Sequence, residues 1–186
     1  MEKLFKPADQ IIHYSQLNNT HEPYAACFPT SLAMALRNNG YQYNDPAKGF
    51  DDYIFELAST AKYDKIWKSL DGKAKPHQLP GLMVVLANDL LASQGIKKTA
   101  KRVDYTYDTA KAQIDAGNQI VCGTFFTKFG HMICISGYTE NTLIVNDPYG
   151  NVNEYYHFND GNRLDDGALV KLDKQWLSKL WYLIVF

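Results

Sequence analysis

The sequence predicts an α+β fold, with helices in its first half and an antiparallel sheet in its second half. Apolar residues recur at helical spacing in four segments before residue 117. From residue 119 onwards, apolar runs of strand length alternate with turns that contain Gly or Asn. Helices followed by a run of strands are typical of α+β folds, because hairpins between consecutive strands build an antiparallel sheet.

Four helices are expected in the first half. The best marked runs from Pro29 to Asn39, since proline suits a first helical turn and Gly40 suits the position just past the end. The others span Asp51–Thr60, Leu79–Ser93 and Asp108–Ala116, with Asp108 as the cap of the last. Residues 1–26 are expected to be extended. The Lys- and Asp-rich stretch before Leu79 is expected to form surface loops.

Five strands are expected to form the sheet. They span Gln119–Phe126, His131–Tyr138, Thr142–Asn146, Val152–Phe158 and Trp181–Phe186. Glu140-Asn141 is a plausible hairpin turn between the second and the third of them. Five strands are a usual size for a sheet.

Composition limits the class of protein. A chain of 186 residues predicts a single domain, over residues 1–186, and its net charge of -1 gives no attraction to nucleic acid. The longest apolar run, Leu82–Ala87, is too short to span a bilayer, and Met1–Gln10 lacks the apolar core of a signal peptide. Three cysteines are too few for a disulfide framework. We therefore expect a soluble protein that is cytoplasmic as synthesised, in a reducing compartment.

A cysteine stands at the start of the first expected helix. The free N–H groups and the dipole at a helix start favour negative charge, and the thiolate is the reactive form of cysteine. Most free cysteines are small buried hydrophobes, and Cys122 and Cys134, each inside an apolar strand, fit that description. Cys27 fits it less well and is therefore the candidate nucleophile.

A histidine and an aspartate lie at the ends of two neighbouring expected strands. His131 follows Gly130 and opens an apolar strand, and the glycine would let another group approach the ring closely. Asp147 ends the next strand and is placed to hold the imidazole in the right tautomer. Taken alone, a lone histidine is more often a core residue, and a turn aspartate is common. Together with Cys27, however, they give the order Cys, His, Asp on adjacent elements.

These motifs resemble those of the papain-like cysteine peptidases related to the bacteriocin-leader (double-glycine) peptidases. The resemblance rests on Ser15-Gln16, on the stretch Cys27–Leu36, on Gly130-His131 and on Asn146–Gly150. Residues 41–107 carry no motif that can be placed. The resemblance implies a papain-like fold, with the nucleophile at the N-terminus of a helix that packs on the antiparallel sheet.

The resemblance also implies a role for each of four residues. Cys27 is the nucleophile, His131 the general base and Asp147 the acid that orients it. The side chain of Gln16 is implied as a donor to the oxyanion, a role that suits an amide, although a loop glutamine is more often simply solvated. The sequence departs from the family at Phe28, where glycine is usual, and a bulky ring there would narrow the site or change its substrate.

The acidic, glycine-rich run over residues 159–167 has the composition of a calcium loop. Leu164 interrupts the alternating oxygen ligands that an EF-type loop needs, so a surface turn is favoured over a calcium site. No cluster of Cys and His has zinc spacing. We expect neither a metal nor a cofactor.

The leading interpretation is a cysteine peptidase or amidase that cleaves a peptide or amide bond through an acyl-enzyme on Cys27. Bacterial cell-wall peptide (peptidoglycan) is the preferred substrate, as for a phage-type lysis enzyme that reaches the wall by another route than a signal peptide. Two alternatives stay open. One is an acyl or peptidyl transferase on the same scaffold, and the other is a binding module that kept the fold and lost turnover.

Overall fold

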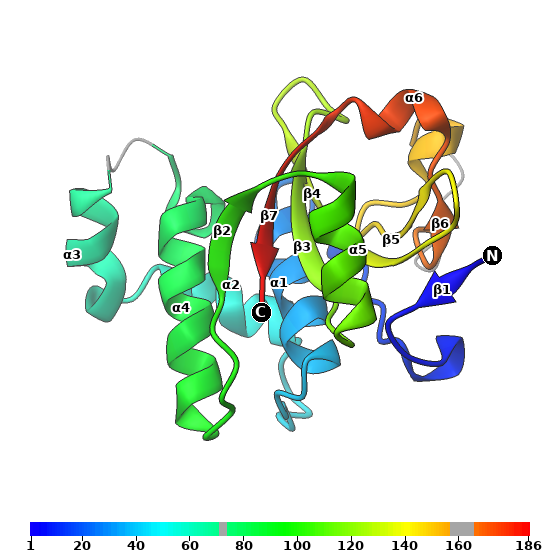
Figure 1. Ribbon diagram of the computed structural model, residues 1–186. Coiled ribbons are helices and arrows are strands. Elements are labelled where there is room, and N and C mark those ends of the chain that lie inside the picture. Colours follow the sequence, from blue (N-terminus) through cyan, green and yellow to red (C-terminus); the bar gives the residue numbers. More distant parts are fainter. Residues whose placement is uncertain (71–73, 157–165) are drawn as a thin grey trace.

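An antiparallel sheet forms the centre of the molecule (Figure 1). The computed structural model describes residues 1–70, 74–156 and 166–186. In these ranges the strands follow the order β2 (Lys101–Asp104), β7 (Leu180–Val185), β3 (Ile120–Thr124), β4 (His131–Tyr138), β5 (Leu143–Asn146) and β6 (Val170–Lys171). The short strand β1 (Lys3–Leu4) pairs with the end of β4. The predicted α+β class with an antiparallel sheet is confirmed.

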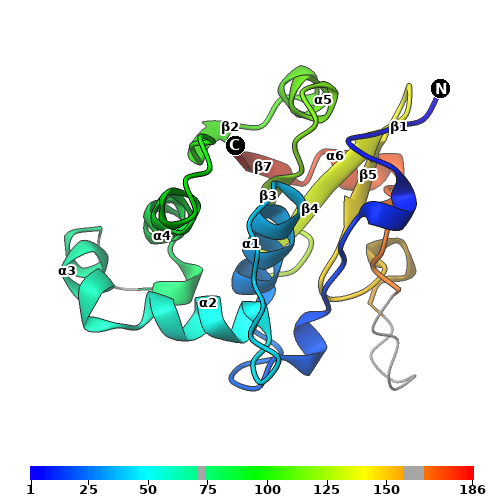
Figure 2. The ribbon, with the colours of Figure 1, turned by 90° about the horizontal axis from the view of Figure 1, so that it is seen from below.

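Helices pack on both faces of this sheet. The helices in the described residues are α1 (Cys27–Asn38), α2 (Phe50–Ala58), α3 (Ala61–Ser69), α4 (Pro80–Ser93), α5 (Tyr107–Asp115) and α6 (Lys174–Leu177). Short 3-10 turns lie at η1 (Ala8–Gln10), η2 (Gln16–Asn18), η3 (Pro76–Gln78) and η4 (Val152–Glu154). Seen from below, α1 covers one face of β3 and β4, and α5 covers the other (Figure 2).

The alternation of side chains along the central strands divides the core into two clusters. Val121 and Cys134 face α1 and join a cluster that extends to α2 and α4. Their neighbours Cys122 and Ile133 point the other way, into a second cluster that includes Ile114 of α5. Both faces of the sheet are therefore buried at its central strands β3 and β4, which explains why these two read as nearly continuous apolar runs.

The elements with the clearest sequence patterns lie within two residues of their predicted bounds, and these include α1, α2, α4, α5, β3, β4, β5 and β7. The C-terminus of α1 follows the expected pattern, since Gly40 comes directly after the cap and has a φ of +106°. The hairpin turn at Glu140-Asn141 is also found, because Thr139 N–H donates to the carbonyl of Thr142 at 2.8 Å.

Other predictions are wrong. The expected strand Val152–Phe158 is instead the turn η4 up to Glu154, and Tyr155 and Tyr156 adopt positive φ angles of 54° and 50°, which no strand contains. Residues 157 and 158 lie outside the described residues.

Three further differences come from weak local patterns. A helix, α3, occupies part of the stretch predicted to be loop, with Tyr63 as its buried anchor. The strand β2 lies at the edge of the sheet and is mostly exposed, so it lacks an apolar run. The cap of α5 is Thr106, whose side chain accepts a hydrogen bond from Thr109 N–H, and not Asp108. No helix in the described ranges is both long enough and apolar enough to cross a bilayer.

Candidate active site

Cys27 is the first residue of α1, and its side chain is partly exposed, whereas the other two cysteines are buried in the sheet. Two contacts dock the start of α1 on β4. Ser31 Oγ donates to the carbonyl of Met132 at 2.9 Å, and Cys134 Sγ donates to the carbonyl of Ser31 at 3.0 Å. This docking brings the start of the helix beside the start of β4, where His131 stands.

Phe28, the departure from the family pattern, points into the core. Its side chain is 2% exposed and belongs to the apolar cluster between α1, α2 and α4. Successive residues of a helix point about 100° apart, so a partly exposed Cys27 and a buried Phe28 are compatible. The structure therefore does not support the expectation that this ring narrows the site.

Gly130 shapes the entry to β4 through its backbone conformation. Its φ of +84° lies in the left-handed region, which glycine adopts without strain. A turn closes here, since Gly130 N–H donates to the carbonyl of Thr127 at 3.1 Å. A Cβ at this position would lie 3.7 Å from the carbonyl oxygen of Thr124, an ordinary contact. The glycine is thus needed for the turn, and the expected close approach to the His131 ring is not its reason.

A buried hydrogen bond joins His131 to Asp147, which directly follows β5. His131 Nε2 lies 2.7 Å from Asp147 Oδ1, and the two residues are 5% and 0% exposed. Nε2 faces the carboxylate, and the Cys27 side chain lies near enough to the ring to favour its protonated form. The structure thus brings together Cys27, His131 and Asp147.

The charge of the imidazole follows from these contacts. Burial by itself lowers the pKa of His131, because it penalises the charged form. The Asp147 carboxylate, assisted by Cys27, outweighs this penalty and raises the pKa of His131 to about 10. The ring therefore holds a proton at neutral pH and can pair with a thiolate. Burial raises the pKa of the Cys122 and Cys134 thiols, so both stay protonated and unreactive.

Two tyrosines complete the surroundings of the imidazole, and sequence reasoning assigned a role to neither of them. Tyr156 Oη donates to Asp147 Oδ2 at 2.7 Å, and its ring meets the His131 ring edge-on, with centroids 5.7 Å apart. The ring centroid of Tyr149 lies 6.0 Å from that of His131. The Tyr156 contact depends on a left-handed backbone at residues 155 and 156, for which the sequence offers no signal.

Gln16 is buried, with 1% of its surface exposed. It is therefore not the solvated loop glutamine that the sequence left open as an alternative. Its backbone N–H donates to the carbonyl of Pro148 at 2.8 Å. Its side-chain Nε2 donates to the carbonyl of Pro23 at 2.7 Å, while Oε1 has no hydrogen-bond partner among the described residues. An amide nitrogen carries two hydrogens, so one N–H of Gln16 remains for another acceptor.

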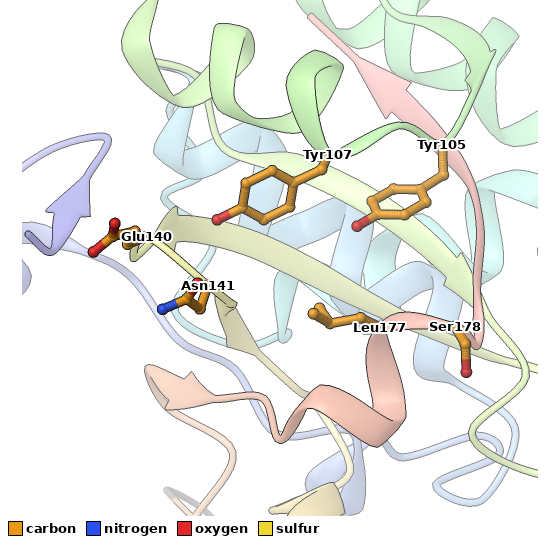
Figure 3. A pocket seen from close by; sticks show the side chains of 6 residues that line it. All are labelled: Tyr105, Tyr107, Glu140, Asn141, Leu177 and Ser178. Atoms are coloured by element: carbon orange, nitrogen blue, oxygen red, sulfur yellow. The ribbon is translucent and has the colours of Figure 1, made fainter.

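A separate hollow of about 490 Å³ lies on the side of the sheet that α5 covers (Figure 3). It is lined by Tyr105, Tyr107, Glu140, Asn141, Leu177 and Ser178. Tyr107 Oη donates to the carbonyl of Thr139 at 2.6 Å, so this hydroxyl already serves the fold. The lining contains neither a cysteine nor a histidine and therefore offers no pair of nucleophile and base.

Across residues 1–70, 74–156 and 166–186, no group of three or more His, Cys, Asp or Glu side chains could hold a metal ion. The run considered for calcium, residues 159–167, lies outside the described residues except for Asp166 and Gly167.

Comparisons with known proteins find two similarities to this chain. The model of the Peptidase_C39 like family matches residues 8–176 of the chain. A crystal structure of a Bacillus anthracis protein, described as a C39-like peptidase, is similar with a TM-score of 0.54 and 16% sequence identity, over 100% of this chain and 98% of that chain. At this identity the likeness shows a shared fold alone. No curated protein matches the chain.

Proposed function

Because the chain belongs to the Peptidase_C39 like family, a family of cysteine peptidases, we propose that it is a thiol-dependent hydrolase of peptide or amide bonds with Cys27 as its nucleophile. One observation carries the proposal. The buried Asp147 carboxylate binds the His131 imidazole through Nε2 at 2.7 Å, and the side chain of Cys27, at the start of α1, lies near the same ring. A nucleophile, a base and a group that orients the base are the parts that acyl transfer requires.

The reaction begins with His131 holding the proton and Cys27 as thiolate. The sulfur forms a bond to the substrate carbonyl carbon, and the carbonyl oxygen takes up the electron pair as an oxyanion. His131 then gives its proton to the leaving amine, the C–N bond breaks, and an acyl-enzyme remains on Cys27. Water attacks the thioester carbon while His131 accepts one of its protons, and the C–S bond breaks. The carboxylic acid leaves, and Cys27 is again a thiolate beside the protonated His131.

Two donors are proposed to stabilise the oxyanion. The backbone N–H of Cys27 lies in the first turn of α1, where the helix supplies no carbonyl partner. The second donor is the N–H of Gln16 that Pro23 does not occupy. Donors fixed in place before the reaction stabilise the developing charge without a cost of reorganisation. Burial of Gln16 and its two backbone contacts supports this role, because they hold its side chain in one orientation.

Selective alkylation tests the nucleophile. Near neutral pH, iodoacetamide should modify Cys27 first, because it is partly exposed and lies at the start of α1 while the other two thiols are buried. Peptide mapping by mass spectrometry at short reaction times would measure this, and Cys122 and Cys134 serve as internal controls. Modification of either of these before Cys27 would contradict the assignment.

We propose bacterial cell-wall peptide as the substrate. The analogy with compact lysis hydrolases suggests it, and an exposed ring beside the site supports it. Tyr24 is 79% exposed and packs edge-on against Tyr149, with centroids 6.5 Å apart, next to His131. Such a ring suits a substrate in which short peptides adjoin sugars, since sugars and peptide groups both lie flat on aromatic faces.

Digestion of purified peptidoglycan tests the substrate. Mass spectrometry of the soluble products should reveal new amino and carboxyl termini, and Cys27→Ala should yield none. Release of peptides from an unrelated unfolded protein, without release from peptidoglycan, would overturn the proposed substrate but not the proposed hydrolase activity. An added primary amine separates hydrolysis from transfer, because a transferase would form the amide of that amine. Absence of any acyl-enzyme with all these substrates would favour the binding module.

A further inference from the structure

The carboxylate of Asp147 is held through both of its oxygens. Oδ1 accepts from His131 Nε2 at 2.7 Å and from the backbone N–H of Tyr149 at 2.9 Å. Oδ2 accepts from Tyr156 Oη at 2.7 Å. Rotation of the carboxylate about its Cβ–Cγ bond would break contacts on both sides at once. The Tyr156 hydroxyl on Oδ2 and the Tyr149 N–H on Oδ1 therefore hold the carboxylate with Oδ1 toward the imidazole.

Tyr156 reaches this position through an unfavourable backbone. Its φ of 50° lies in the left-handed region, as does that of the preceding Tyr155, and neither residue is a glycine. The side chain is nonetheless buried, at 8% exposed, and its ring packs against Tyr149 at 5.2 Å as well as against His131. Non-glycine residues keep such conformations where the surrounding structure fixes them, often at functional sites.

A second contact holds the backbone of Asp147 from another side. Asp147 N–H donates to the carbonyl of Gly167 at 2.8 Å. A Cβ at position 167 would lie 1.8 Å from the carbonyl oxygen of Asp147, so only a glycine fits this close approach. Tyr156 fixes the side chain of Asp147 while Gly167 fixes its main chain.

We propose that Tyr156 is a positioning residue of the active site, which orients the Asp147 carboxylate toward His131 and covers their hydrogen bond with its ring. This role rests on the proposed function, because it matters only if His131 serves Cys27. Tyr156 acts through Asp147 and does not itself touch the reacting atoms. Its hydroxyl sets the direction of the carboxylate, and its ring keeps solvent from the pair.

Tyr156→Phe tests the hydroxyl, since it keeps the ring and removes one hydrogen-bond donor. We expect kcat to fall on the order of tenfold, the usual effect of losing a hydrogen bond to a buried charge, with KM unchanged. Tyr138→Phe is the matched control. Tyr138 also donates to a carboxylate, Asp115 at 2.8 Å, but on the surface, so turnover should stay at the wild-type level. Unchanged kcat in Tyr156→Phe would overturn the proposal.

A double-mutant cycle separates positioning from mere structural support. If Tyr156 acts through Asp147, then Tyr156→Phe should have almost no further effect in an Asp147→Asn background. If the two substitutions instead lower kcat independently, so that their factors multiply in the double variant, the tyrosine supports the fold in general and the proposal fails.

Alkylation of Cys27 by iodoacetamide gives the same cycle a readout without a substrate. Tyr156→Phe should slow it in the wild-type background and leave it unchanged beside Asp147→Asn. If the wild-type protein hydrolyses nothing, the proposed function fails, yet this reaction still decides whether Tyr156 orients the imidazole that activates the thiol. Equal alkylation rates in all four proteins would overturn the positioning role.

Discussion

Two histidines in different regions of the molecule are buried to nearly the same degree, yet their rings favour opposite charge states. His131 lies at the start of β4 and is 5% exposed, and its pKa is raised to about 10. His77 lies in η3, against α2, and is 2% exposed. Burial lowers the pKa of His77 to about 4, and the opposing effect of Glu22 is too weak to reverse it.

The difference lies in the carboxylate that each ring meets. Asp147 is fully buried and hydrogen-bonded to His131 at 2.7 Å. Glu22 stays 3.6 Å from His77 Nε2, its side chain is about one-third exposed, at 34%, and it also pairs with Lys75. The ring of His77 also stacks on the ring of Phe55, with centroids 4.1 Å apart. Burial alone makes a histidine neutral, whereas a fixed carboxylate at hydrogen-bonding distance makes it a cation, and only the second environment suits a thiolate.

The largest effect should come from the pair Cys27 and His131. Cys27→Ala should abolish turnover, and His131→Ala should lower it by at least about a thousandfold, since the thiol then loses its base. The double variant should be no slower than either single one, because the two groups act as a unit. Single-turnover kinetics and thermal melting would measure both effects. A Cys27→Ala protein that stays fully active but melts much lower would make Cys27 a core residue.

The next effect tests whether the carboxylate makes the difference between the two histidines. Asp147→Asn should keep the fold and lower kcat by roughly 100- to 10,000-fold, because the amide no longer stabilises the imidazolium. The pKa of His131 should fall from about 10 toward the low range of His77. NMR titration of the ring and the basic limb of kcat/KM should both move to lower pH. If neither moves, another group sets the charge of His131.

A smaller effect should appear in the stability of the His77 region. Because the pKa of His77 is about 4 in the folded protein and about 6.5 unfolded, the unfolded state binds more protons between these values. The free energy of unfolding should therefore fall as pH drops from 6.5 to 4, by at most about 3 kcal/mol from this residue. Urea unfolding at several pH values should show a flatter dependence in His77→Gln than in wild type. The same dependence on pH in His77→Gln and in wild type would contradict the neutral state of this histidine.

The smallest effect concerns Glu22, the one group that raises the pKa of His77. Glu22→Gln should lower the pKa of His77 a little further and change the free energy of unfolding at pH 7 by less than about 0.5 kcal/mol, as is usual for an exposed ion pair. Proton NMR of the ring at acid pH would measure the first, and turnover should stay at the wild-type level. A large loss of stability at pH 7 would mean that His77 is charged there.

The sequence predicts well those parts of the fold that a local pattern determines. The helix α1 is found because proline, an apolar stripe and Gly40 agree over its whole length, and β4 because residues 132–137 are continuously apolar or small. The residues Cys27, His131 and Asp147 each stand at the end of such an element. Their convergence follows once the helix and the hairpin are in place.

Contacts that depend on tertiary structure cannot be predicted from local sequence patterns. Edge strand β2 is defined by its pairing with β7, and its four residues carry no apolar run of their own. Tyr156 reads as one residue of a strand because Val, Tyr and Phe recur around it, yet its role comes from a left-handed turn. His77 illustrates the converse, since nothing in its neighbours distinguishes a buried histidine from a solvated one.

Strand β7 lies between β2 and β3, although it follows both in the sequence. A ribosome delivers residues in order, so both strands wait with an open edge until residues 180–185 have left the exit tunnel. The face on which α1 packs is also completed only then, because Tyr182 and Ile184 belong to it. The thiol is therefore made well before its rigid setting, which is complete only after β7 has emerged. A nascent chain halted before β7 would not attack neighbouring proteins with its thiol. It would be prone to aggregate through its unpaired strands.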